Sequence, residues 1–263
     1  MTTLLHEAVA GPVRSYEHFL AQYRRVWRGT IGTSLLNPLL FLAAMGIGLG
    51  TLVDASPNAP AGVRYLDFVA PGLLAAAAMQ TAATESSFPV MAAMRWSRTY
   101  HAMLATPLRI RDVLLGHQLF VATRVLVASA AYLGIVAAFG SVKSPLGLLV
   151  VPVAVLLGAA FAGPVMALAA TVENGAAFPP MFRFAIMPMF LFSGTFFPVE
   201  RLPLLAEWVA YATPLWHAVA LSRSLTLGAP EVLPALGHVS YLALWAVAGA
   251  MLAAWRYRKA LGG

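Results

Sequence analysis

Six long apolar stretches constrain this sequence more than any other feature. A helix needs about 20 mostly apolar residues to cross a hydrocarbon core of about 30 Å, and each stretch is close to that length or longer. The stretches do not alternate as barrel strands do, so helices are the expected state. The sequence therefore predicts an all-α polytopic membrane protein with six transmembrane helices. The approximate spans are residues 33–53, 67–91, 116–139, 147–171, 179–197 and 235–255.

The composition supports a membrane protein. Hydrophobic residues make up 60% of the 263 residues and charged residues 10%, and the mean hydropathy is +0.78. This is more apolar surface than a soluble domain could bury. The net charge of +7 is spread in short clusters, so we expect it to orient the chain in the membrane and not to bind nucleic acid. The absence of cysteine excludes disulfides and thiolate chemistry.

Lysine and arginine are distributed unequally between the two sides of the predicted spans. Residues 1–32 contain four arginines, the segment 92–115 contains four, and the tail 256–263 contains three basic residues, which with Arg183 makes twelve on one side. Because basic loops are retained in the cytoplasm, we expect both termini to be cytoplasmic and residues 33–255 to form the transmembrane domain. The four basic residues of the opposite side are Arg64, Lys143, Arg201 and Arg223.

An amphipathic segment, residues 12–29, precedes the first span. Its large apolar side chains recur at i, i+3, i+4, i+7 and i+11, and its arginines fall on another face. We expect a helix in the cytoplasmic interface, with aromatic side chains toward lipid and arginines toward headgroups or a partner. A simple anchor and a partner-binding helix both fit the pattern. The apolar set is Tyr16, Phe19, Leu20, Tyr23 and Trp27.

Two charged residues, Glu85 and Arg124, lie well away from the ends of predicted spans. Glu85 in the second span and Arg124 in the third each lie about seven residues, or about 10 Å, from the cytoplasmic end. An unpaired charge at that depth is costly, so we expect the two to pair, with each other or across a subunit interface. Direct contact with a substrate and snorkelling of the side chains are the alternatives.

The cytoplasmic segment 95–117 keeps an apolar stripe although it is polar enough to leave the bilayer. Tyr100, Met103, Leu104 and Leu108 recur with nearly helical spacing on either side of Pro107. A loop of this length with its own stripe is expected to dock on something. A solvated connection is the alternative.

Motifs for catalysis and energy conversion are absent. The only lysines, Lys143 and Lys259, follow Val142 and Arg258, so the chain has no phosphate-binding Gly-Lys-Ser/Thr loop. Its six histidines form no metal-binding spacing and no GxSxG motif occurs, so we expect interfacial histidines, no catalytic residue, no metal and no enzyme activity. Acids suited to proton coupling are limited to Glu85 and, near span ends, Asp67 and Glu173.

The external segment after the fifth span is too short to cross the membrane again. Residues 200–212 and 214–227 are apolar, but each would reach only about 20 Å as a helix. The charge count also requires an even number of crossings here. We therefore expect a re-entrant or surface-lying hairpin between helices 5 and 6. Its bend and turns are expected at Ser193, Gly194, Pro198, Pro203 and Pro214.

These features together resemble the ABC-2 type permeases, in the branch of nodulation-factor and daunorubicin exporters. SGTFFPVERLP (193–203) followed by ATPLWHAV (212–219) matches the family's most specific stretch, and RTYHAMLATPLRIRDVLLG (98–116) matches its loop. The resemblance covers essentially the whole chain. It implies the membrane subunit of an ABC exporter in a bacterial plasma membrane, moving a drug, lipid or glycolipid outward. A polysaccharide or lipo-oligosaccharide exporter, a membrane enzyme and a proton-coupled carrier are the alternatives.

The resemblance also implies partners and roles. Family members act as dimers of permeases, identical or paralogous, on two separate ATPase subunits that bind ATP and Mg, so no cofactor is expected in this chain. The outer bend residues would form an extracellular gate. The connecting helix on the ATPase would include Tyr23, Arg24, Arg25, Trp27 and Arg28. The ATPase-coupling helix would include Arg98, Tyr100, His101, Met103, Leu104, Ala105, Thr106 and Pro107.

Overall fold

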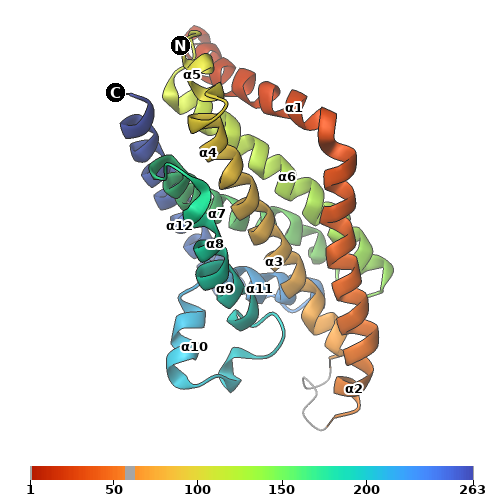
Figure 1. Ribbon diagram of the computed structural model, residues 1–263. Helices are drawn as coiled ribbons and strands as arrows, with labels where there is room; N and C mark the ends of the chain where they lie inside the picture. The colour runs from red at the N-terminus through yellow and green to blue at the C-terminus, as the bar shows by residue number, and fades with distance from the viewer. Residues whose placement is uncertain (1, 57–62, 263) are drawn as a thin grey trace.

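The structure, a computed structural model, describes residues 2–56 and 63–262, without the side chains of residues 2–9, 26, 28–38 and 47. This part of the chain is helical and contains no β-strand. Figure 1 shows an elongated bundle with both termini and α5 at one end, and with α2 and α10 at the other. An all-α membrane fold, as the sequence predicts, is therefore confirmed.

The helices differ widely in length, and several are joined by short 3-10 (η2, η3, η5) or π-helical (η1, η4) segments. The long helices are α1 Thr2–Ala43, α3 Tyr65–Ser86, α6 Ile110–Ala138, α7 Val150–Thr171 and α12 Val232–Leu261. The short ones are α2 Gly50–Asp54, α4 Phe88–Arg95, α5 Thr99–Leu104, α8 Phe178–Met181, α9 Met187–Phe192, α10 Leu204–Tyr211 and α11 Pro214–Leu227. The joining segments are η1 Ala44–Leu49, η2 Pro145–Leu149, η3 Gly175–Ala177, η4 Phe182–Ile186 and η5 Val199–Arg201.

Five helical segments in the described residues are long and apolar enough to cross a membrane. They are Tyr65–Arg95, Ile110–Ala138, Pro145–Thr171, Gly175–Phe192 and Val232–Leu261. The sixth expected span, 33–53, corresponds to the end of α1, η1 and α2, where Leu39–Asp54 forms a shorter apolar helix. The fifth segment ends at Phe192, earlier than the expected residue 197, because the chain bends at Ser193 and Gly194 takes φ +77°.

Helix α7 forms the centre of the bundle and packs against α3, α6 and α12. A Cβ on Gly163 would lie 2.3 Å from the carbonyl carbon of Gly249, so the backbones of α7 and α12 touch at this point. The outer faces are different. Only 11% of the residues are buried in the most apolar stretch of Gly175–Phe192 and in that of α12. Both segments therefore present apolar surface to lipid or to another subunit.

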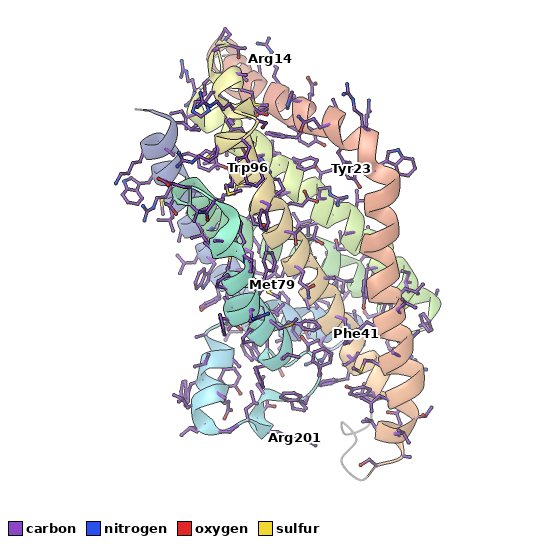
Figure 2. All side chains as sticks on the ribbon, viewed as in Figure 1. Arg14, Tyr23, Phe41, Met79, Trp96 and Arg201 are labelled. Carbon is purple, nitrogen blue, oxygen red and sulfur yellow. The ribbon has the colours of Figure 1, made fainter. Side chains whose placement is uncertain are left out.

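Helix α1 changes direction along its length. The part that carries Arg14 runs obliquely across the end of the bundle, and the part that carries Phe41 descends along its side (Figures 1 and 2). Close packing holds the oblique part on α6. A Cβ on Gly116 would lie 2.5 Å from the Cβ of Ser15, so only glycine lets the two helices approach this closely.

Candidate functional site

The predicted coupling segment, residues 98–107, has one face buried in the bundle and one face exposed. Tyr100 is fully buried and Met103 nearly so, and Leu104 is half-buried. The remaining residues predicted to contact an ATPase are exposed: Arg98, His101, Ala105, Thr106 and Pro107. The structure therefore brings the predicted residues together on α5 and the turns that flank it, and divides them into a buried group and an exposed group.

Tyr100 holds the segment to α6. Its hydroxyl lies 2.6 Å from Nδ1 of His117, and its ring packs against Tyr257 of α12 with centroids 5.8 Å apart. Burial raises the pKa of the Tyr100 phenol well above its ordinary value, so it stays protonated and donates. On the other side of the imidazole, Nε2 of His117 lies 3.2 Å from the backbone oxygen of Glu85.

The amphipathic segment of α1, residues 12–29, which includes the predicted connecting helix, packs on protein at positions where lipid contact was expected. Phe19 is 6% exposed and lies 4.5 Å from the His117 ring and 6.0 Å from that of Phe120. Tyr23 lies between α1 and α6 and bonds Arg124 (Figure 2). The expectation that this aromatic face meets lipid is wrong for these two residues, because α6 offers it an aromatic surface. Of the other predicted residues, Arg24, Arg25 and Trp27 are exposed, and the Arg28 side chain is outside the described residues.

Glu85 and Arg124 lie together inside the bundle. Nε of Arg124 is 2.9 Å from Oε1 of Glu85, and the Arg124 side chain is 6% exposed. The guanidinium also donates to the hydroxyl of Tyr23 and lies over its ring, 4.2 Å from the centroid. The three side chains join α3, α6 and α1, so the contact is intramolecular and buried.

The outer bend is packed tightly on α3. Ser193 is buried, and its Oγ lies 3.1 Å from Oγ1 of Thr213. Thr213 caps α11, which begins at Pro214, and its Oγ1 accepts from the amide of Trp216. Pro198 and Pro203 precede the short helices η5 and α10. The structure therefore brings Ser193 and Gly194 close to the start of α11 at Pro214, whereas Pro198 and Pro203 lie at the starts of η5 and α10.

Arg223 of α11 holds this bend against α3. Its guanidinium donates to the backbone oxygen of Phe68 at 3.1 Å and to that of Gly194 at 2.7 Å, and it lies 3.6 Å above the Phe68 ring. Burial lowers the pKa of Arg223 to about 10, so the side chain stays charged at neutral pH. The charge count placed Arg223 on the outer side but gave it no role.

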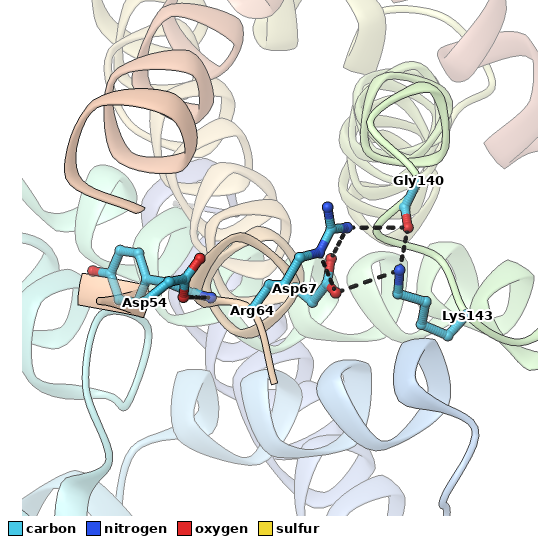
Figure 3. Close-up of polar contacts among 6 residues, drawn as sticks. Asp54, Arg64, Asp67, Gly140 and Lys143 are labelled. Carbon is cyan, nitrogen blue, oxygen red and sulfur yellow. Dashed lines mark hydrogen bonds and ion pairs between the residues drawn. The ribbon is translucent and has the colours of Figure 1, made fainter. Parts of the chain in front are cut away.

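A second polar cluster closes the outer end of α3 (Figure 3). Both carboxylate oxygens of Asp67 accept from Arg64, at 3.1 and 2.8 Å, and Nζ of Lys143 lies 3.5 Å away. Lys143 also donates to the backbone oxygen of Gly140. A buried carboxylate held by two cations is poorly suited to take up and release a proton, which weakens the carrier alternative for Asp67.

A cavity of about 830 Å³ opens between α1, α3, α6 and the α8–α9 segment. Most of its lining is apolar, including Leu40, Phe41, Leu73, Met187 and Phe190. Its polar lining comes from Gln80, Tyr132 and Arg183. The Tyr132 hydroxyl is buried and has no hydrogen-bond partner among the described residues. Both π-helical segments contribute to the wall, η1 with Ala44 and η4 with Phe182, and π turns are frequent at functional sites.

Histidines are the residues that sequence reasoning missed. The expectation of isolated interfacial histidines is wrong for His117, which is 2% exposed and bonded on both sides. It is also wrong for His217 and His238, whose Nδ1 atoms lie 2.9 Å apart. A usable signal existed for His117. Pro89 follows Glu85 by four residues and lacks an amide hydrogen, so the Glu85 carbonyl needs another donor.

Comparisons with known proteins agree with this geometry. The family described as ABC-2 type transporter matches residues 17–227, which include the connecting segment and α11. Nodulation protein J of Rhizobium leguminosarum bv. trifolii is 34% identical over 238 residues, covering 88% of each chain. Its counterpart in Rhizobium meliloti (strain 1021) is 33% identical over 226 residues, covering 86% of this chain and 84% of the relative. That of Bradyrhizobium diazoefficiens is 31% identical over 244 residues and 90% of each chain.

Proposed function

Because the chain belongs to the ABC-2 type transporter family, we propose that it is the permease of an ATP-driven exporter powered by a separate ATPase. The observation that carries this proposal is the divided coupling segment. Its buried face is fixed to α6 and α12 by Tyr100, and its exposed face is available to a partner at the end of the bundle where both termini lie (Figure 1). Nucleotide-driven closure of two ATPase subunits would push this face and tilt the spans.

The proposal includes six spans with cytoplasmic termini in a bacterial inner membrane. Both termini lie at the same end of the bundle (Figure 1), which supports an even number of crossings. Five segments meet the length and composition criteria, so the descending part of α1 with η1 and α2 is the sixth. The helices α10 and α11 then form the outer hairpin, which does not cross. The exposed apolar faces of α9 and α12 would meet lipid or a second permease, identical or paralogous.

The cavity of about 830 Å³ supports a substrate class. Its apolar wall suits an acyl chain or other apolar group, and Arg183 with the unpartnered Tyr132 hydroxyl suits an acidic or hydrogen-bonding headgroup. We therefore propose a hydrophobic or amphipathic substrate, taken from the cytoplasm or the inner leaflet. A lipo-oligosaccharide is the second candidate, because the relatives are nodulation proteins.

Reconstitution with the cognate ATPase tests the proposal. ATP hydrolysis is measured with amphiphiles of equal chain length that carry an anionic, a cationic or an uncharged oligosaccharide head. We expect the anionic or the oligosaccharide amphiphile to stimulate hydrolysis, and Arg183→Ala to weaken the response to the anionic one. Arg258→Ala, which removes an exposed charge of the tail, is the matched control. Transport that ignores ATP and is abolished by uncouplers would instead identify a proton-coupled carrier.

A further inference from the structure

The second predicted span is broken near its cytoplasmic end. Helix α3 ends at Ser86 and α4 begins at Phe88, because Ser87 takes φ −96° and ψ −99°, outside the helical region. Pro89 stands in the first turn of α4 and has no amide hydrogen. The backbone oxygen of Glu85, four residues earlier, therefore lacks its helical donor.

His117 supplies the missing donor from the neighbouring helix. A carbonyl oxygen can only accept, so Nε2 of His117, 3.2 Å from the Glu85 oxygen, must carry the hydrogen. Nδ1 of the same ring is then the acceptor for the Tyr100 hydroxyl at 2.6 Å. One neutral imidazole thus joins the coupling segment to the break between α3 and α4.

His117 is tightly packed by α1 and α6, and a cavity lies beside α4. His117 is 2% exposed and is packed by Phe19 and Phe120, so the imidazole has little freedom to turn. A cavity of about 460 Å³ lies between α1, α4 and α6, and Pro89, Ala92 and Ala93 of α4 form part of its wall. Helix α4 therefore has space to move into, whereas the link from the end of α3 to α5 through His117 is short and fixed.

From this geometry we infer that His117 is a positioning residue at a hinge between α3 and α4. This role rests on the proposed function, because it describes how movement of the ATPase would reach the spans. A push on the exposed face of α5 moves Tyr100, Tyr100 moves His117 relative to the Glu85 carbonyl, and α4 swings about Ser87 while α3 stays packed against α7. The chain can bend at this point because the Glu85 carbonyl has no donor within its own helix, whereas an intact helix would resist bending there.

Two substitutions change this bridge in opposite ways. Tyr100→Phe removes the hydroxyl that links α5 to His117 and leaves the Glu85 carbonyl bonded. Pro89→Ala supplies the missing amide hydrogen and favours a continuous helix, so it should stabilise the fold while stiffening the hinge. Ser129→Ala is the matched control, because the Ser129 hydroxyl of α6 bonds only the carbonyl of Leu126 in its own helix.

The test is a distance measurement in the full transporter with its ATPase. The chain has no cysteine, so spin labels can be placed at Arg95→Cys and Leu119→Cys alone, and the shorter distance within one permease reports the separation of α4 and α6. Distances are compared without nucleotide and after trapping with ATP and vanadate. We expect a shift in the wild type and in Ser129→Ala, and loss of most of the shift in Tyr100→Phe and in Pro89→Ala.

The outcomes separate this inference from the proposed function. An unchanged shift in Tyr100→Phe or Pro89→Ala would overturn the hinge, and so would a shift that merely follows thermal stability across the variants. A wild type that binds no ATPase, or shows no shift, would overturn the proposed function and the hinge with it. If Tyr100→Phe does not insert, His117→Phe serves instead, since its ring can keep the packing against Phe19 and Phe120 but neither donates to the Glu85 carbonyl nor accepts from Tyr100.

Discussion

Glu85 and Arg124 place an ion pair inside the helix bundle. Arg124 is almost fully buried and its charge is balanced by one carboxylate and one hydroxyl, those of Glu85 and Tyr23. A buried ion pair is weak evidence for stability by itself, because desolvation offsets its attraction. Removing one partner is different, since it leaves an uncompensated charge. The pair therefore fixes the relative depth of α3 and α6 more than it adds net stability.

The charge exchange Glu85→Arg with Arg124→Glu tests this pair. Either single alanine substitution should lower the free energy of unfolding by about 3 kcal/mol, the lower end for a broken buried pair, because Glu85 is 19% exposed. The exchange should recover part of that loss, measured by thermal unfolding in detergent. If the exchanged protein is no more stable than the single variants, the two charges do not depend on each other.

At the scale of elements, the proposed role of residues 98–107 would separate folding from docking, because one face is buried and the other is exposed. The inward face of α5 carries Tyr100 and Met103, and the outward face carries His101 and Ala105. Replacing the whole segment with Gly and Ser would remove both functions together and would confound them. Substitutions limited to the outward face are therefore the informative ones.

We expect His101→Glu with Ala105→Glu to abolish binding of the ATPase without lowering the thermal midpoint. Both positions are exposed, so new charges there meet water in the isolated permease and meet the partner only in the complex. Co-purification of the ATPase is the measurement. Lys259→Glu, a charge reversal in the exposed tail, is the control and should still bind. Retention of the ATPase by the double variant would place its docking surface elsewhere.

The outer hairpin should lose stability in acid. Burial, together with neighbouring His238, lowers the pKa of His217 to about 4, and its Nε2 donates to the backbone oxygen of Tyr211. In the unfolded chain this histidine has an ordinary pKa near 6.5. As the pH falls, the unfolded chain is therefore protonated before the folded protein. The stabilising contribution is therefore complete above about pH 6.5 and is lost as the pH falls toward about 4.

Thermal midpoints between about pH 7.5 and pH 4.5 measure this loss. His217→Phe can keep the stacking on Tyr241, where the ring centroids are 3.9 Å apart, but cannot titrate. Its midpoint should be lower at neutral pH and should change less with pH than that of the wild type. His238 is present in both proteins, so the difference between the two curves reports His217 together with its contact with His238. Parallel curves would show that His217 is not the sensitive group.

The sequence predicted these elements well where the signal was local. Long apolar runs located the five helical segments, and Thr213 with Pro214 marked the boundary between α10 and α11, because capping and proline act within a few residues. Contacts between distant segments were less accessible. The His117 bridge and the Arg223 anchor depend on which carbonyl faces which helix, and periodicity does not specify that. The apolar stripe of α1 was visible, but lipid and α6 are equally apolar partners for it.

At the scale of the whole molecule, polar anchors at both ends enclose an apolar middle. At the end where both termini lie, His117 and Arg124 join α1, α5 and α6, and toward the opposite end Arg223 joins α3 and α11. The larger cavity lies between these two sets of anchors and opens on the face of α1 and α8–α9. Under the proposed function, movement of α5 would therefore reach the cavity before it reaches the bend at Ser193.

The proposed function depends on the orientation of the chain in the membrane, and cysteine labelling tests that orientation. Because the chain has no cysteine, single cysteines at Ala105 and at Leu205 report one side each, and both positions are exposed. In intact cells, a membrane-impermeant maleimide should label Leu205→Cys on α10 and should label Ala105→Cys only after the membrane is opened. The reason is the excess of basic residues on the side of α5. The reverse pattern would place α5 outside, where no ATP-driven partner could reach it.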